Sequence, residues 1–325
     1  ELKCAQLHEL ELKCAQLHGG RRPRSKTPRG VGEHQGMTRP PLPLLGAHVS
    51  AAGGLHRAIE RARALDAECL QVFTRAPGAW KARPRDADET TRFREAHAAV
   101  GKPPLLVHDI YLANLASPPG DLRDRSIETV VEERVHCADL GAVGLVCHMG
   151  AHLDAGVEIG LQRYAESIGE VLKRTAGNPV PILLENSAGQ GTCLGHDLAH
   201  IGRVLEMVNA PRDLGVCLDT CHLFAAGYDL RNQEGYDALW SALERAIGLD
   251  RLRAFHLNDA KKGLGSRVDR HEHIGRGELG LAPFERLLAD PRVAGLPMII
   301  ETPEVDEMHI VNLETLRTAR RAGAR

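Results

Sequence analysis

The sequence has few aromatic residues, almost no net charge and no long apolar segment. Phe, Trp and Tyr make up 3% of its 325 residues, which argues against a surface of stacked aromatic rings that holds exposed bases. The 41 Lys and Arg residues nearly balance the 43 Asp and Glu residues, so composition alone does not indicate a polyanionic partner. No apolar run approaches the roughly 18 residues of a membrane span, and no signal-peptide pattern opens the chain. These absences predict a cytoplasmic protein with no membrane partner.

Cysteine is sparse and irregularly spaced, whereas histidine is plentiful. The 8 cysteines do not form the regular pattern of a disulfide framework, so we expect a reduced protein. The 17 histidines are the unusual count, and their positions relative to the apolar runs carry the functional argument. No heptad pattern or interface strip is evident, and we expect a monomer.

Residues 1–36 differ in composition from the rest of the chain. The string ELKCAQLH occurs twice there, followed by a run rich in Arg and Gly, and no apolar face is sustained. We expect a disordered or spurious N-terminal extension before a single domain at residues 37–325. The extension holds 7 basic and 4 acidic residues, which leaves a formal charge of −5 on the domain. The alternative is an arm that binds metal or DNA through Cys4, His8, Cys14, His18 and the Arg cluster.

Eight short apolar runs recur along the domain, as is typical of buried parallel strands. They are LLGAHVS (44–50), CLQVFT (69–74), PLLVHD (104–109), GLVCHMG (144–150), PILLEN (181–186), LGVCLDT (214–220), LRAFHLND (252–259) and PMIIETP (297–303). Amphipathic stretches separate them, such as Leu55, Ala58, Ile59, Ala62 and Leu65 on one helix face.

This alternation of strand and helix predicts an α/β protein with a (β/α)8 TIM barrel as its single domain. A doubly wound open sheet is the alternative fold. That fold favours a Gly-rich phosphate loop after the first strand, and GAHVSAAGG lacks the G-x-G-x-x-G spacing.

Seven of the eight runs end on a residue that can bind metal. The end residues are, in order, His48, Thr74, His108, His148, Glu185, Asp219, His256 and Glu301, of which only Thr74 is a weak ligand type. A barrel brings its strand ends to one face, where active sites are built. Burying so many ionisable groups without partners is costly, so bound cations are the economical explanation.

The loops that follow these runs add further candidate ligands. These are His222, Asp269, His271 and His273. Mixed His, Asp and Glu ligands suit zinc or manganese at a hydrolytic site. Cys217 and Cys221 could form a zinc-binding pair, but we interpret them as small buried apolar residues.

The candidate ligands outnumber those of a single zinc, which takes three or four protein groups. Nine are counted: His108, His148, Glu185, Asp219, His222, His256, Asp269, His271 and Glu301. They imply at least two dications, and three if one carboxylate bridges. Three dications would concentrate positive charge in the cleft and would favour a phosphate ligand in spite of the acidic domain.

Six strings resemble the endonuclease IV family of AP (apurinic/apyrimidinic) endonucleases. They are GAHVSAAGGL (46–55), LENSAGQG (184–191), LDTCHLFAAGYD (218–229), HLNDAK (256–261), DRHEHIGRGELG (269–280) and ETP (301–303). The resemblance implies a zinc-dependent deoxyribonuclease IV, a phosphoric diester hydrolase of base excision repair. Such an enzyme cuts duplex DNA on the 5′ side of an abasic site and leaves a 3′-hydroxyl.

The resemblance also implies three Zn²⁺ ions per chain, with manganese as the alternative at some positions. The ligand sets that it implies are His108 and His148 with Glu185; Glu185 with Asp219, His256 and Glu301; and His222 with Asp269 and His271. A hydroxide held between the first two ions would attack phosphorus, with Glu185 and Glu301 as the catalytic carboxylates. His48 would lie beside the site without binding metal, and His273 has no assigned role.

The DNA contacts implied by the resemblance are partly preserved. Tyr111 and Leu112 match residues that fill the gap left by the displaced nucleotide. Gly78 stands where the family often has an Arg that enters the DNA, and Arg75 and Lys81 are the nearest cations. Phosphate contacts are expected from cations on the strand-end loops: Lys81, Lys261, Lys262, Arg267 and Arg270.

Two other functions remain open on this evidence. A metal-dependent sugar isomerase or epimerase uses similar ligands around one or two ions and does not need His222, Asp269 and His271, so the number of bound ions discriminates. A non-catalytic binder of damaged DNA would need no ordered attacking group, so a Glu185→Gln variant discriminates.

Overall fold

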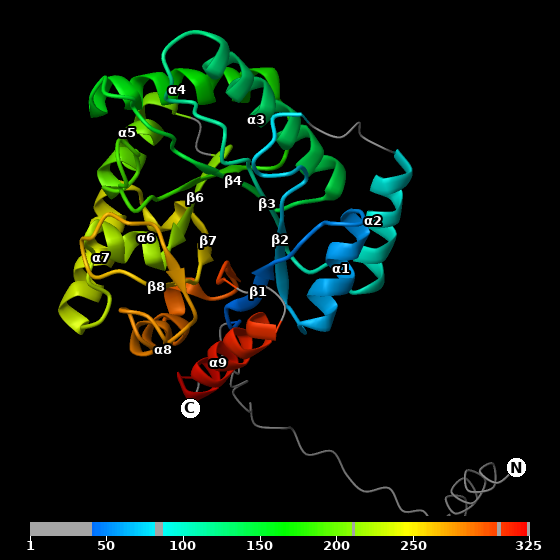
Figure 1. Ribbon diagram of the computed structural model, residues 1–325, viewed down its shortest axis with the longest axis vertical. Helices are drawn as coiled ribbons and strands as arrows, with labels where there is room; N and C mark the ends of the chain where they lie inside the picture. The colour runs from blue at the N-terminus through cyan, green and yellow to red at the C-terminus, as the bar shows by residue number, and fades with distance from the viewer. Residues whose placement is uncertain (1–40, 82–86, 210–211, 304–306, 324–325) are drawn as a thin grey trace, which may run out of the picture. The chain divides into compact units, whose positions relative to one another are not determined.

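The computed structural model describes residues 41–81, 87–209, 212–303 and 307–323. Within these ranges, eight parallel strands close into a barrel with helices around its outside (Figure 1). The order around the barrel is β1-β10-β7-β6-β5-β4-β3-β2. The predicted TIM barrel is confirmed, and pairing of β1 with β10 excludes the open sheet. The extension expected at residues 1–36 lies outside the described residues.

Each of the eight apolar runs contains one barrel strand. The strands are β1 (Leu44–His48), β2 (Cys69–Val72), β3 (Leu105–His108), β4 (Gly144–His148), β5 (Ile182–Glu185), β6 (Leu214–Asp219), β7 (Leu252–His256) and β10 (Pro297–Ile300). A separate antiparallel hairpin is formed by β8 (Asp259–Ala260) and β9 (His271–Glu272).

Helices follow the strands and cover the barrel. In the described ranges they are α1 (Leu55–Ala64), α2 (Ala87–Ala99), α3 (Asp121–Leu140), α4 (Val157–Arg174), α5 (Leu198–Val208), α6 (Thr220–Ala226), α7 (Gln233–Ala246), α8 (Ala282–Leu288) and α9 (Glu307–Gly323), with short 3-10 turns at Leu249–Arg251 and Pro291–Val293. The predicted face of α1 is buried at Leu55, Ala58, Ile59 and Ala62. None of the helices in the described ranges combines the length and apolarity that crossing a bilayer requires.

The barrel interior contains a plug of apolar side chains, one from each of seven strands. The plug consists of Cys69, Leu106, Val146, Leu183, Cys217, Ala254 and Ile299, each at most 1% exposed. The eighth strand, β1, contributes Gly46 near this level, where a Cβ would lie 1.8 Å from the carbonyl oxygen of Cys69. Only glycine fits so close to the neighbouring backbone.

The plug positions the polar residues above it, because side chains two positions apart on a strand share a face. Adding two to each plug residue gives Gln71, His108, His148, Glu185, Asp219, His256 and Glu301. These side chains therefore form the next layer, at the carboxyl ends of the strands, where barrel enzymes build their sites. The two-residue spacing thus places a layer of six ionisable side chains and one amide directly above the apolar plug.

Candidate metal centre

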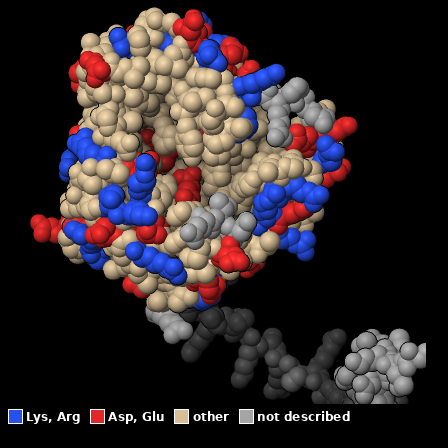
Figure 2. All heavy atoms as spheres, in the orientation of Figure 1, with Lys and Arg blue, Asp and Glu red and all other residues tan. Residues whose placement is uncertain are grey.

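The nine predicted ligand residues meet at the carboxyl ends of the barrel strands. Each is linked to another of the nine by a His nitrogen and a carboxylate oxygen no more than 3.9 Å apart. Figure 2 shows acidic side chains on the floor of a hollow in this face, with basic side chains near its rim. The side chains within the hollow fall into three overlapping groups.

The first group consists of His108, His148 and Glu185, whose potential ligand atoms all lie within 4.8 Å of one another. Oε2 of Glu185 lies 3.2 Å from Nε2 of His108 and 3.1 Å from Nδ1 of His148. Nδ1 of His108 lies 2.6 Å from the carbonyl oxygen of Asp109. Donation to this carbonyl leaves the Nε2 lone pair directed at Glu185, which is how metal-binding histidines are commonly oriented.

The second group consists of Glu185, Asp219, His256 and Glu301, again within 4.8 Å. Nδ1 of His256 lies 2.8 Å from Oε1 of Glu185, 3.2 Å from Oε2 of Glu301 and 4.0 Å from Oδ2 of Asp219. The two oxygens of Glu185 thus face different groups. This carboxylate would contribute one oxygen to each group.

The third group is formed where α6 meets the β8–β9 hairpin. Nε2 of His222 and Nε2 of His271 lie 3.2 and 3.4 Å from the two carboxylate oxygens of Asp269. Asp219 belongs here too, with Oδ2 3.7 Å from Nε2 of His271. The group therefore shares Asp219 with the second one.

Two buried nitrogen atoms in the third group are placed as the ligand atoms of a cation would be. Nε2 of His222 and Nε2 of His271 are buried without a hydrogen-bond partner. Their Nδ1 atoms face backbone carbonyl oxygens of Asn186 and Glu301, at 2.9 and 3.1 Å. With Nδ1–H donating, each Nε2 presents a lone pair towards a carboxylate, an arrangement that a shared cation stabilises.

Cys221 lies near this group, although we expected it to act only as packing. Its Sγ is close to ligand atoms of Asp269 and His271, and it donates to the carbonyl oxygen of Arg270 at 3.6 Å. Burial, reinforced by Asp219 and Asp269, raises the pKa of the thiol well above its usual range. Cys221 therefore lies within reach of the third group as a donor, and its expected role as packing alone stays a prediction.

The carboxylates of the centre carry negative charge in spite of their burial. Burial opposes ionisation of Glu185, but His148, His256 and His108 hold its pKa well below the usual range. Burial likewise opposes ionisation of Asp269, yet the neighbouring histidines, His222 foremost, lower its pKa to about 2. Anionic oxygens and imidazoles together form the donor set that zinc and manganese prefer.

Three buried amides around the carboxylates were missed in the sequence. Asn258 donates from Nδ2 to Oδ2 of Asp219 at 2.7 Å and accepts from the backbone N–H of Glu301 at 2.8 Å. Oδ1 of Asn186 accepts from the backbone N–H of Asp219 at 2.7 Å. Gln71 is the third. A lone amide inside an apolar strand is the signal that would have revealed it.

Two residues predicted to fill the gap left by the displaced nucleotide lie beside the mouth of the hollow that holds the ligand groups. Tyr111 is 63% exposed, and its ring centroid lies 5.4 Å from that of Phe73 and 6.0 Å from that of His108. Its backbone N–H donates to the carbonyl oxygen of Pro77 at 3.1 Å. Partial burial, then the nearby carboxylates, raise the pKa of the phenol to about 12, so the ring is neutral. Leu112 is half-buried next to it.

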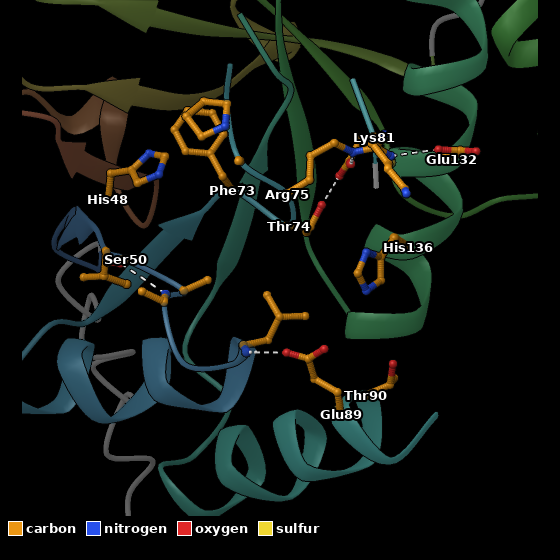
Figure 3. A pocket seen from close by; sticks show the side chains of 17 residues that line it. His48, Ser50, Phe73, Thr74, Arg75, Lys81, Glu89, Thr90, Glu132 and His136 are labelled. Atoms are coloured by element: carbon orange, nitrogen blue, oxygen red, sulfur yellow. Dashed lines mark hydrogen bonds and ion pairs between the residues drawn. The ribbon is translucent and has the colours of Figure 1, made fainter. Parts of the chain in front are cut away.

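Arg75 is not placed to substitute for the arginine that the family often has at the position of Gly78. It lies in the wall of a cavity of about 570 Å³ beside the mouth (Figure 3), is 8% exposed, and pairs with Glu132 at 2.9 Å and with Glu133. Burial and these pairs hold it away from solvent, whereas Lys81, on the same wall, is exposed. A Cβ at Gly78 would meet no described atom within 4 Å, so space does not explain the glycine.

The other predicted cations are exposed on the segment between β8 and β9. They are Lys261, Lys262, Arg267 and Arg270. Nη1 of Arg270 donates to the carbonyl oxygen of Asp269 at 2.6 Å, which ties this cation to the third group. The two histidines predicted near the site without a metal-binding role lie at the edge of the three groups. Nδ1 of His48 is 3.3 Å from Oε1 of Glu301, while His273 is buried against Asn312 of α9.

Known proteins resemble this chain over most of its length. Residues 51–321 match the family described as xylose isomerase-like TIM barrel. A Chloroflexus aurantiacus protein named "Probable endonuclease 4" is 45% identical over 279 residues, covering 85% of this chain and 98% of its own. Endonuclease IV from Thermus thermophilus is 34% identical with a TM-score of 0.77, covering 86% of this chain and 100% of that structure. A D-tagatose 3-epimerase-like protein, 16% identical with a TM-score of 0.69 and coverages of 86% and 98%, shares the barrel alone.

Proposed function

The chain belongs to the endonuclease 4 family of xylose isomerase-like TIM barrels, and from this premise we propose that it hydrolyses duplex DNA on the 5′ side of abasic sites. The product would carry a 3′-hydroxyl, as base excision repair requires. The observation that carries the proposal is the third group, in which two buried imidazole nitrogens face Asp269 without hydrogen bonds. A sugar isomerase or epimerase with one or two metals has no use for this group.

The three groups of side chains would hold three divalent cations, zinc or in part manganese. Their residues are His108, His148 and Glu185; Glu185, Asp219, His256 and Glu301; and His222, Asp269 and His271. When bound, such ions make water nucleophilic near neutral pH and offset the charge of a phosphodiester. Glu185 would set the separation of the first two groups, because each of its oxygens faces a different one.

The chain's own residues would also orient the reacting groups. Glu185 belongs to the first and second groups and Glu301 to the second, and their anionic oxygens would accept hydrogen bonds from the attacking water. Asn258 holds Asp219 and the Glu301 backbone in place, so the second group is assembled before substrate arrives. Such preorganisation is the main source of catalysis in sites of this kind.

Selection of the lesion would depend on the rim of the mouth. An abasic nucleotide has no base to unpair, so extruding it costs less than extruding a normal nucleotide. Tyr111 and Leu112 would occupy the gap in the duplex, and Lys81, Lys261 and Arg270 would contact phosphates. The exposed, neutral ring of Tyr111 suits contact with unstacked bases.

Cleavage of a defined oligonucleotide tests this function. The full chain is incubated with a duplex containing one abasic site and with an undamaged duplex, each with and without chelator, and the 3′ end is resolved. We expect cleavage of the abasic duplex alone, a 3′-hydroxyl end, loss of activity with chelator and about three ions per chain. One or two ions per chain without cleavage would favour the isomerase alternative, and tight binding without cleavage would favour a DNA binder.

Replacement of Tyr111 by alanine is expected to raise KM for the abasic duplex about tenfold, because aromatic contacts to bases contribute ~1–3 kcal/mol. The turnover number and the metal content should change little, since the ring lies on the rim and not among the ligand atoms. Steady-state kinetics and metal analysis give both quantities.

Tyr111→Phe is the matched control and should behave as wild type, because the role assigned to this residue belongs to the ring. An unchanged KM in Tyr111→Ala would contradict the contact.

A further inference from the structure

We propose that Gln71 of β2 is a positioning residue of the metal centre, whose amide fixes the ring of His256 and the carboxylate of Glu301. The inference rests on the proposed function in assuming that the second group holds a cation. The proposal assigns a role to β2, the one barrel strand whose apolar run ends without a residue that binds metal strongly.

The position of Gln71 in the barrel is the first argument. It lies two residues after Cys69 of the plug and is 0% exposed. In the layer above the plug, the six other strands that contribute to it supply His, Asp or Glu, and β2 supplies this amide. A buried amide is retained only where its hydrogen bonds are satisfied, because desolvation is costly.

The hydrogen bonds of the amide are the second argument. Oε1 of Gln71 lies 2.9 Å from Nε2 of His256, and Nε2 of Gln71 lies 2.6 Å from Oε1 of Glu301 and 3.0 Å from Nδ1 of His48. An amide oxygen can only accept, so Nε2 of His256 must carry a hydrogen. The two amide hydrogens are sufficient for Glu301 and His48.

These bonds decide which atoms remain for a cation. With its hydrogen on Nε2, a neutral His256 presents the lone pair of Nδ1 to Glu185 and Glu301, 2.8 and 3.2 Å away. The amide occupies Oε1 of Glu301, which leaves Oε2 as the ligand atom on the side of His256. Gln71 therefore selects both the tautomer of the imidazole and the oxygen of the carboxylate.

Other side chains of similar size would not do this. Methionine fills a similar volume but offers neither the donor nor the strong acceptor, so His256 and Glu301 would each lose a partner. Glutamate keeps an acceptor for His256 but places a second carboxylate against Glu301, which like-charge repulsion opposes. Both changes are predicted to loosen the second group.

The test compares Gln71→Met with Leu70→Met. Leu70 is the neighbouring residue of β2, is 0% exposed, and packs with the core outside the plug, so it controls for disturbance of the strand. For Gln71→Met we expect zinc to be held about 10- to 100-fold more weakly, the range for loss of a partner behind a ligand. Competition with a chromophoric chelator measures this affinity without reference to activity.

A kinetic comparison separates positioning from general damage. In Gln71→Met, kcat on the abasic duplex should fall while KM stays near that of wild type, because Gln71 is fully buried within the ligand layer and out of reach of DNA. Leu70→Met should match wild type in zinc affinity, kcat and KM. A variant that raises KM and leaves zinc affinity unchanged would overturn the proposal.

A second variant keeps the proposal testable if Gln71→Met does not fold. Gln71→Glu has the same shape as the wild-type side chain and should also weaken zinc binding at least about tenfold. If either variant is folded, melts like wild type and holds zinc as tightly as Leu70→Met, the proposal is wrong. If the wild-type protein binds zinc but leaves abasic DNA intact, the proposed function fails, and the zinc affinities still decide the role of Gln71.

Discussion

Glu185→Gln is expected to reduce cleavage of the abasic duplex roughly a thousandfold, an effect as large as those found when one electrostatic group is removed from a reacting centre. Glu185 is 0% exposed and uses both oxygens, Oε2 towards His108 and His148 and Oε1 towards His256. A glutamine offers one oxygen and no charge, so it cannot serve two groups at once. Single-turnover cleavage of a labelled abasic duplex measures the loss.

Glu68→Gln is the control for removal of a carboxylate from the barrel. Glu68 lies just before β2, where it pairs with Arg320 of α9 and accepts from the backbone N–H of Leu45. This substitution should leave the cleavage rate unchanged. Cleavage at the wild-type rate in Glu185→Gln would refute the assigned role, whereas retained binding of abasic DNA without cleavage is the result that the proposed enzyme requires.

Gly277→Ala is expected to remove one cation and lower kcat at least about a hundredfold. Asp259 is 0% exposed and accepts from the backbone N–H groups of Ala260, Gly277 and Leu279 at 2.7, 3.0 and 2.9 Å. A Cβ at Gly277 would lie 2.5 Å from Oδ1 of Asp259 and 2.5 Å from the carbonyl oxygen of Ala260. The substitution would therefore force apart the contacts that hold the β8–β9 hairpin, on which His271 lies.

The substitution should change the metal content and leave the stability of the barrel nearly unchanged, because the hairpin lies outside the barrel. Metal analysis should show about two ions per chain, against the three proposed for wild type, while the barrel melts near its wild-type temperature. Gly263→Ala, in the segment between β8 and β9, is the control, since a Cβ there would meet no described atom within 4 Å. Three ions retained in Gly277→Ala, with full activity, would show that the hairpin does not hold a ligand group.

Much of the fold and of the ligand set could be predicted from the sequence, for one physical reason. A parallel strand repeats its direction every two residues, so an apolar run followed by His, Asp or Glu places that side chain above the barrel floor. His108, Glu185 and His256 follow directly from this rule. The grouping of the ligands into sets came from family resemblance and remains a proposal.

The remaining features depend on contacts between residues far apart in the sequence. Arg75 was a candidate for contacting DNA, but it is held by Glu132 and Glu133 of α3, more than 50 residues away. Gln71 was overlooked because its partners, His256 and Glu301, come from the opposite end of the chain. No local pattern reports such pairings, since closure of the barrel creates them.

The apolar plug also determines on which side the metal centre is open to solvent. Its seven side chains fill the barrel below the ligand layer, so within the described residues the ligand layer opens at the strand ends. A duplex bound over this opening would itself shield the scissile phosphate from bulk solvent.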